Sequence, residues 1–141
     1  MARVSRLALQ FVTAAALAVS AYLHLNLAGG YDLIGEQVTL GHLFRVQAAS
    51  AVIAGLALLA RPAQLTWALA ALVGFGSLAA LVLTVYVAVP AIGPFPRIHE
   101  PVWFPDKTLA AVAAALAAAA ATAGLLTHGR RVRARRTATS T

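Results

Sequence analysis

Four long apolar runs decide what this chain can fold into. They cover residues 7–27, 40–60, 65–89 and 108–127, and shorter polar connections separate them. Each run has the roughly 20 helical residues needed to cross about 30 Å of hydrocarbon. Because backbone in lipid must satisfy its own hydrogen bonds, each run is expected to be a helix. The sequence therefore predicts an all-α polytopic membrane protein, an antiparallel bundle of four transmembrane helices.

The composition excludes several other classes of protein. With 61% hydrophobic and only 11% charged residues, a chain of 141 residues is too apolar for a soluble domain. The absence of cysteine excludes disulfides and thiolate metal sites. A pI near 11.4 would indicate nucleic-acid binding in a soluble protein. Here the basic residues flank apolar runs, so no nucleic-acid partner is expected.

Charged residues divide between the two ends of the predicted helices. One side carries eight arginines and no acid: Arg3, Arg6, Arg61, Arg130, Arg131, Arg133, Arg135 and Arg136. The other side carries all four acids together with three basic residues: Asp32, Glu36, Glu100, Asp106, Arg45, Arg97 and Lys107. Basic residues favour the cytoplasmic ends of membrane helices. We therefore predict a multi-pass protein of the plasma membrane, with both termini cytoplasmic and the acids on the outer side.

The connections differ in length and character. Residues 61–64 are few enough to force the second and third helices into an antiparallel hairpin. Residues 90–106 hold five of the six prolines, so we expect a stiff, extended cap there, with Asp106 as the N-cap of the fourth helix. We assign residues 1–128 to one transmembrane domain. Residues 129–141 are predicted to be a basic, disordered cytoplasmic tail near anionic headgroups.

The first run also fits a different interpretation. A basic start, an apolar stretch and the residues Val19, Ser20 and Ala21 are the parts of a bacterial signal peptide, which would be cleaved after Ala21. The run nevertheless stays apolar to Leu27, as a transmembrane helix would. Both interpretations stay open on the sequence alone.

Small and polar residues follow one face of the first and third helices, at spacings of three and four. The two stripes are Gln10, Thr13, Leu17, Ser20 and His24, and Ala70, Gly74, Ser77, Leu81 and Thr84. Such stripes permit close helix approach and interhelical hydrogen bonds. A polar translocation path is the alternative, although no acidic residue lies deep in any run.

Eight ionisable residues on the outer side form the candidate site. They are His24, Asp32, Glu36, His42, Arg45, His99, Glu100 and Asp106. Arg45 lies about one and a half turns into the second run, where a guanidinium is costly unless it is paired. We expect an ion pair with one of the four acids. A clamp for a carboxylate or phosphate ligand is the alternative.

The histidines allow a more specific hypothesis. His24 and His42 are expected at one depth on neighbouring helices, with His99 in the cap, and metals and b-type haem use such sets. These three are the candidate ligands for a divalent metal. Ordinary interfacial histidines, or a proton- or quinone-linked role, are the other interpretations. No catalytic motif is present, so neither an enzyme nor an obligatory cofactor is expected.

Three motifs resemble a known group of proteins. They are His-Leu-Asn-Leu at residues 24–27, Gly-Gly-Tyr-Asp at 29–32 and Gly-His-Leu-Phe-Arg-Val-Gln at 41–47. Through them the chain resembles small four-helix integral membrane proteins of the actinobacterial type, over nearly its whole length. The resemblance implies a four-helix bundle in the plasma membrane and carries over no catalytic residue.

Two functions from different classes fit these features. The first is a non-enzymatic accessory or scaffold protein, which packs small-residue faces on a membrane-protein partner or on another copy of itself. The second is a binding protein with a metal, haem, quinone or small-anion site at the outer face, formed by His24, His42, Arg45 and residues 90–106. A transporter or channel is a third, and would require an oligomer to enclose a pore. All three have the lipid bilayer as a partner.

Overall fold

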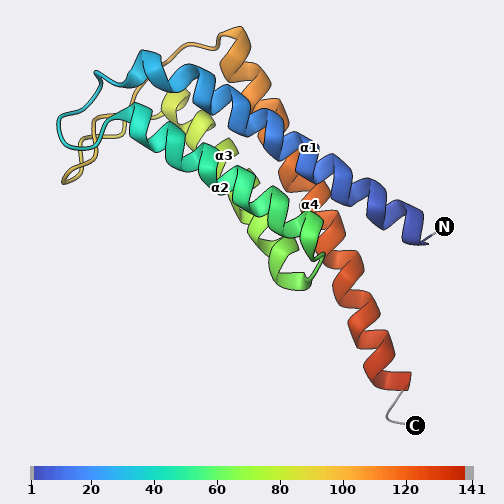
Figure 1. Cartoon of the computed structure of the whole chain (residues 1–141). Coiled ribbons are helices and arrows are strands. Elements are labelled where there is room, and N and C mark those ends of the chain that lie inside the picture. The colour runs from blue at the N-terminus through green and yellow to red at the C-terminus, as the bar shows by residue number, and fades with distance from the viewer. Residues whose placement is uncertain (1, 139–141) are drawn as a thin grey trace.

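The structure, a computed structural model, has four long helices packed antiparallel (Figure 1). They are α1 (Ala2–Ala28), α2 (Leu40–Ala60), α3 (Gln64–Tyr86) and α4 (Pro105–Ala138), and the short 3-10 helix η1 (Gly29–Tyr31) follows α1. The structure describes residues 2–138, and the side chains of residues 4–129. All four helices are long and apolar enough to span a membrane. The prediction of an all-α, four-span membrane fold is therefore confirmed.

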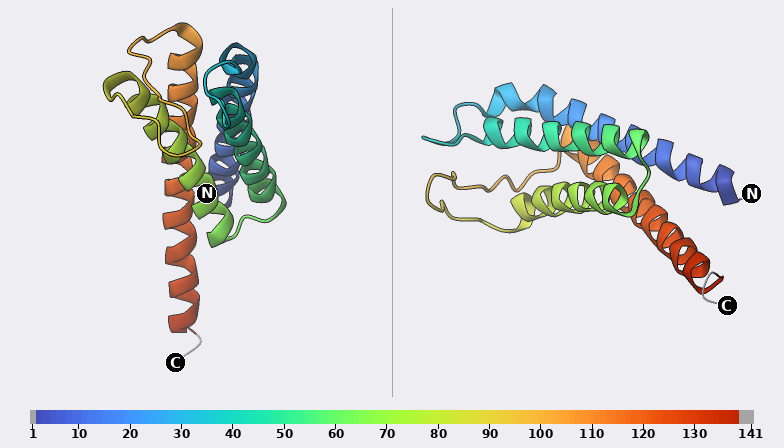
Figure 2. Two further views of the ribbon diagram at one scale, coloured as in Figure 1. Left: turned by 90° about the vertical axis from the view of Figure 1, so that its left-hand side faces the viewer. Right: turned by 60° about the horizontal axis from the view of Figure 1, so that its bottom comes forward.

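The helices follow the order α2, α1, α4, α3 around the bundle. Helix α1 packs along both α2 and α4, whereas α3 packs along α4 and more sparsely along α2. The first residues of α1 and the last residues of α4 lie away from the two long connections, residues 29–39 and 87–104 (Figure 1). We term the end with these connections the loop end, and the end with residues 61–63 the hairpin end. Both views in Figure 2 show α2 and α3 diverging toward the loop end.

Local sequence explains where α2 and α4 begin. The hydroxyl of Thr39 accepts a hydrogen bond from the backbone N–H of His42 at 3.1 Å, which caps α2. Helix α4 begins at Pro105, whose fixed φ and missing N–H suit a first helical position. Asp106 lies within the first turn of α4, so its prediction as the N-cap is wrong. Its carboxylate is still well placed, because the helix N-terminus carries partial positive charge.

Two predicted boundaries need correction. Helix α3 ends at Tyr86, and residues 87–89, expected to be helical, are extended. The disordered tail predicted from residue 129 is wrong over residues 129–138, where α4 continues to Ala138. Alanine and arginine are strong helix formers, and no proline interrupts this segment. Residues 139–141 lie outside the described part of the chain.

The proline-rich connection folds back on itself as a small hairpin. Val89 and Ile98 exchange two backbone hydrogen bonds of 3.0 Å, and Ile92 and Phe95 close the tip. Gly93 takes a φ of +57° at the turn, a conformation that glycine adopts without steric cost. The extended cap expected at residues 90–106 takes this hairpin form up to Ile98, continues without regular structure to residue 104, and gives way to α4 at Pro105.

The core depends on close helix approach more than on large side chains. Most of its buried residues are alanines. A Cβ added at Gly74 would lie 2.8 Å from the backbone nitrogen of Ala118, so α3 and α4 touch backbone to backbone there. The whole polar stripe of α1 is buried, and its Gln10 donates a 2.9 Å hydrogen bond to the carbonyl of Leu58. Cleavage after Ala21 would remove these contacts.

Candidate functional site

A cavity of about 320 Å³ lies at the loop end, lined by all four helices and the proline-rich connection. Its volume is within the range of ~300–1,000 Å³ that small-molecule sites occupy. The polar side chains of the lining are His24, Tyr31, Gln47, Ser77, Thr84, Arg97, His99, Glu100 and Lys107. Leucines, Phe44 and Phe104 supply much of the apolar remainder. The lining therefore suits a molecule with both polar and apolar parts.

Glu100 ties the cap to the helices around the cavity. Its backbone N–H donates to the carbonyl of Thr84 in α3 at 2.8 Å. Its carboxylate accepts a hydrogen bond from the Tyr31 hydroxyl at 2.6 Å and pairs with Lys107 of α4 at 3.1 Å. One residue of the cap thus contacts η1, α3 and α4, each of which contributes residues to the lining of the cavity.

Lys107 is the chain's only lysine, and its side chain is just 3% exposed. Its ammonium donates to the backbone carbonyl of Glu100 at 3.0 Å in addition to the ion pair. The rings of Trp103 and Phe104 lie 5.9 and 6.0 Å from the ammonium, measured to their centroids. A buried charge requires such compensation. Lys107 therefore acts as an anchor for the cap.

His24 is buried in the wall of the cavity. Its Nδ1 donates to the backbone carbonyl of Ser20 at 2.8 Å, because a carbonyl can only accept. The ring packs edge-on against Phe44, with centroids 5.5 Å apart. Among the described residues, its second nitrogen Nε2 has no hydrogen-bond partner. In the neutral ring this nitrogen is an acceptor.

Two polar atoms in the lining are buried without a hydrogen-bond partner among the described residues. They are the hydroxyl of Ser77, a residue 2% exposed, and Nε2 of Gln47. Several other helical hydroxyls donate to a carbonyl of their own helix, as Ser50 and Thr122 do at 2.8 and 2.7 Å, whereas the Ser20 hydroxyl, outside the lining, also lacks a partner among the described residues. Buried polar groups are nearly always satisfied, so these two atoms need an explanation.

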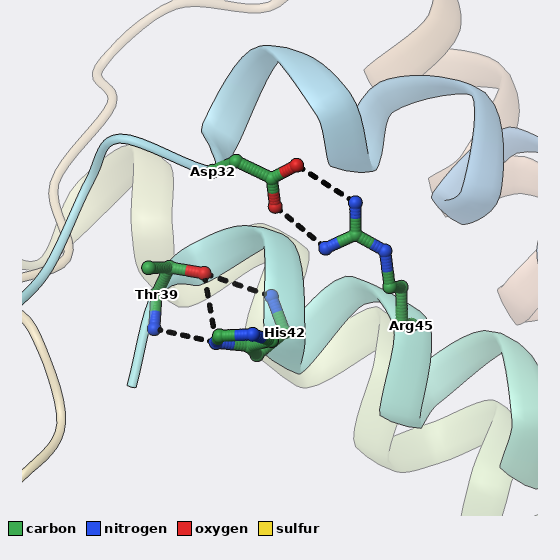
Figure 3. Close-up of polar contacts among 4 residues, drawn as sticks. All are labelled: Asp32, Thr39, His42 and Arg45. Carbon is green, nitrogen blue, oxygen red and sulfur yellow. Dashed lines mark hydrogen bonds and ion pairs between the residues drawn. The ribbon is translucent and has the colours of Figure 1, made fainter. Parts of the chain in front are cut away.

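Arg45 and Asp32 form an ion pair outside the cavity lining (Figure 3). Two guanidinium nitrogens contact the two carboxylate oxygens at 2.5 and 2.7 Å. Asp32 is one of the four acids expected as a partner for Arg45. Because the fork of the guanidinium is already occupied by a carboxylate, the structural ion pair accounts for Arg45 without a bound anion.

This ion pair predicts a pH dependence at the loop end. Hydrogen bonds from Arg45, assisted by its charge, hold the pKa of Asp32 below the ordinary value of 3.8. A lowered pKa means that the stabilisation is complete above the ordinary value and is lost as the pH falls through the lower, folded-state value. A carboxyl titration followed by NMR should give a midpoint below 3.8 for Asp32. In Arg45→Gln the midpoint should rise, and an unchanged midpoint would contradict the assignment.

The other candidate residues do not join the cavity. The ring of His42 accepts at Nδ1 from the backbone N–H of Thr39 at 3.2 Å, completing the cap of α2 (Figure 3). Glu36 is exposed in the first connection, and Asp106 lies in the first turn of α4. Within the described residues, no group of three or more His, Asp or Glu is placed to hold a metal ion. The expected set of His24, His42 and His99 is therefore not brought together.

Several residues that line the cavity are not among the site residues predicted from the sequence. The sequence interpretation uses Lys107 only as one of the outer-side charges, and it includes Tyr31 and Gln47 only in motifs, not in the candidate site. Ser77 was noticed in the stripe of α3, but only as a packing residue. A lone lysine beside an apolar run was a usable signal for Lys107, since such a charge needs a partner. No comparable signal marks Gln47.

Comparison with protein-family models, with curated proteins and with solved structures finds no match to this chain. The resemblance to small actinobacterial four-helix proteins stays a prediction. By helix length and hydropathy the chain is a multi-pass membrane protein, and it carries a mixed polar and apolar cavity at its loop end.

Proposed function

We propose that this protein is a non-enzymatic membrane protein that binds a small molecule in the loop-end cavity. The observation that carries the proposal is the Ser77 hydroxyl, which lines the cavity, is buried and has no partner among the described residues. A ligand oxygen or nitrogen would satisfy it and remove the cost of leaving it unpaired. If both termini are cytoplasmic, as the arginines predict, the cavity lies toward the outer face.

The accessory or scaffold hypothesis has less support. It relies on small-residue faces that pack on another protein, and the alanines of α4 are the largest such set in the chain. Eight of them are buried inside this chain: Ala110, Ala111, Ala113, Ala114, Ala117, Ala118, Ala120 and Ala121. Helix α4 packs along α1 and α3, so these small residues already serve the bundle itself.

Single cysteines test whether the cavity admits small molecules, because the natural chain has none. Ser77 and Ser20 are both buried, at 2% and 1% exposure, and both hydroxyls lack a partner among the described residues. Only Ser77 lines the cavity. We expect methyl methanethiosulfonate, a small neutral reagent, to modify Ser77→Cys at least about ten times faster than Ser20→Cys, since thiol reactivity requires access.

The rates are measured by intact mass, with the thermal midpoint confirming that each variant is folded. Ser20→Cys is the matched control for burial and for helix position. Equal rates in two folded variants would show that the cavity does not admit the reagent, and the proposed function would then fail.

A further inference from the structure

The inner part of the cavity presents a definite set of hydrogen-bonding groups. Ser77 lies nine residues before the end of α3 and Gln47 seven residues after the start of α2, about 13 and 10 Å into their helices. The Gln47 amide nitrogen donates, the Ser77 hydroxyl donates or accepts, and Nε2 of neutral His24 accepts. A complementary ligand therefore carries both hydroxyl and acceptor oxygens.

The charges of the lining favour a neutral ligand. Glu100 and Lys107 neutralise each other at the cap, and Arg97 and His99 lie in the cap as well, outside the helices. The lining residues that α1, α2 and α3 contribute include no Asp, Glu, Lys or Arg, so a carboxylate, phosphate or ammonium beside Ser77 and Gln47 finds no ion partner on these helices. Burying such a charge without a partner is costly.

The shape and position of the cavity narrow the choice further. Phe44 lines it and packs against the rings of His24 and Tyr31, with centroids 5.5 and 4.8 Å away, so one wall is aromatic. Ala80 also lines the cavity yet is exposed on α3, six residues before its end and thus about 9 Å into the helix. That depth lies within the membrane span of α3, so an opening beside Ala80 would face molecules dissolved in the bilayer.

From these groups we infer that the ligand is a neutral hydroquinone-type ring dissolved in the membrane, which enters beside Ala80 and donates a hydroxyl to His24. The inference rests on the proposed function and names its ligand class. An aromatic ring packs on the wall at Phe44, and the second ring oxygen meets Ser77 and Gln47. Only binding is inferred, and no electron transfer is included.

The test measures binding of a short-chain ubiquinol to the purified protein in nanodiscs, by native mass spectrometry under anaerobic conditions. The absence of cysteine removes thiol addition as a side reaction. Ser77→Ala and His24→Phe should each weaken binding about two- to tenfold, the effect of one hydrogen bond. Ser20→Ala should leave binding within about twofold. The natural protein should bind the oxidised quinone less tightly than the quinol. The His24→Phe variant should bind the two forms equally tightly.

A separate pair of variants tests whether the quinol enters the cavity beside Ala80. Ala80→Trp should reduce ubiquinol binding at least about tenfold by filling the opening, whereas Ala79→Trp, also exposed but outside the lining, should not. Tighter binding of oleate or of a diacylglycerol than of the quinol would overturn the ligand class. If Ser77→Cys is modified rapidly and no quinol binds, the ligand class fails while the proposed function stands.

Discussion

Replacing Trp67 by alanine is expected to lower the free energy of unfolding by roughly 3–5 kcal/mol, the range for removing a large buried aromatic ring. Trp67 is fully buried at the hairpin end. Its ring lies so close to Gly124 that a Cβ there would collide with it. The surrounding core is largely alanine, and alanines have no flexible side chains with which to fill the space. The cavity left by the ring therefore persists.

Equilibrium unfolding in mixed micelles measures this loss. Phe75→Ala is the matched control, because Phe75 is on the same helix and 53% exposed. It should cost less than about 1 kcal/mol, as expected for a residue outside the core. A loss below about 1 kcal/mol for Trp67→Ala would contradict the packing at Gly124.

The second large effect concerns the ion pair between Glu100 of the cap and Lys107 of α4. Glu100→Leu should lower the free energy of unfolding by about 2–3 kcal/mol, because it leaves the Lys107 ammonium, 3% exposed, with the backbone carbonyl as its remaining hydrogen-bond partner. Lys107→Met should cost less, since the Glu100 side chain is 37% exposed and water can solvate it. The asymmetry follows from the unequal burial of the two charges.

A double-mutant cycle separates the ion pair from other contacts. The variant carrying both Glu100→Leu and Lys107→Met should be more stable than Glu100→Leu alone, because replacing both charges removes the unpaired ammonium. Equal losses for the two single variants, or strict additivity, would show that the pair does not hold the cap. The Tyr31→Phe variant measures the remaining hydrogen bond to Glu100 independently.

The sequence by itself determined the helices and their antiparallel order. Runs of about 20 apolar residues have no other way to satisfy their backbone in lipid, and the connection at residues 61–64 leaves no room for a parallel arrangement. It also determined which polar groups lie at the same end of the bundle. His24 is close to the first long connection, and His99 and Glu100 are part of the second. The extent of α4 was missed, because a basic composition was interpreted as disorder although arginine is a good helix former.

Only the tertiary structure decided which of these groups meet. Ser20 and Ser77 look alike in the sequence, as small polar residues on helical stripes, and both are buried. Ser77 alone lines the cavity, because α2 and α3 diverge toward the loop end (Figure 2). His42 and Arg45 lie outside the cavity, as Ser20 does. His42 is hydrogen-bonded to Thr39, and Arg45 is paired with Asp32. The rotation of each helix about its axis settles these differences, and close packing of alanines sets that rotation.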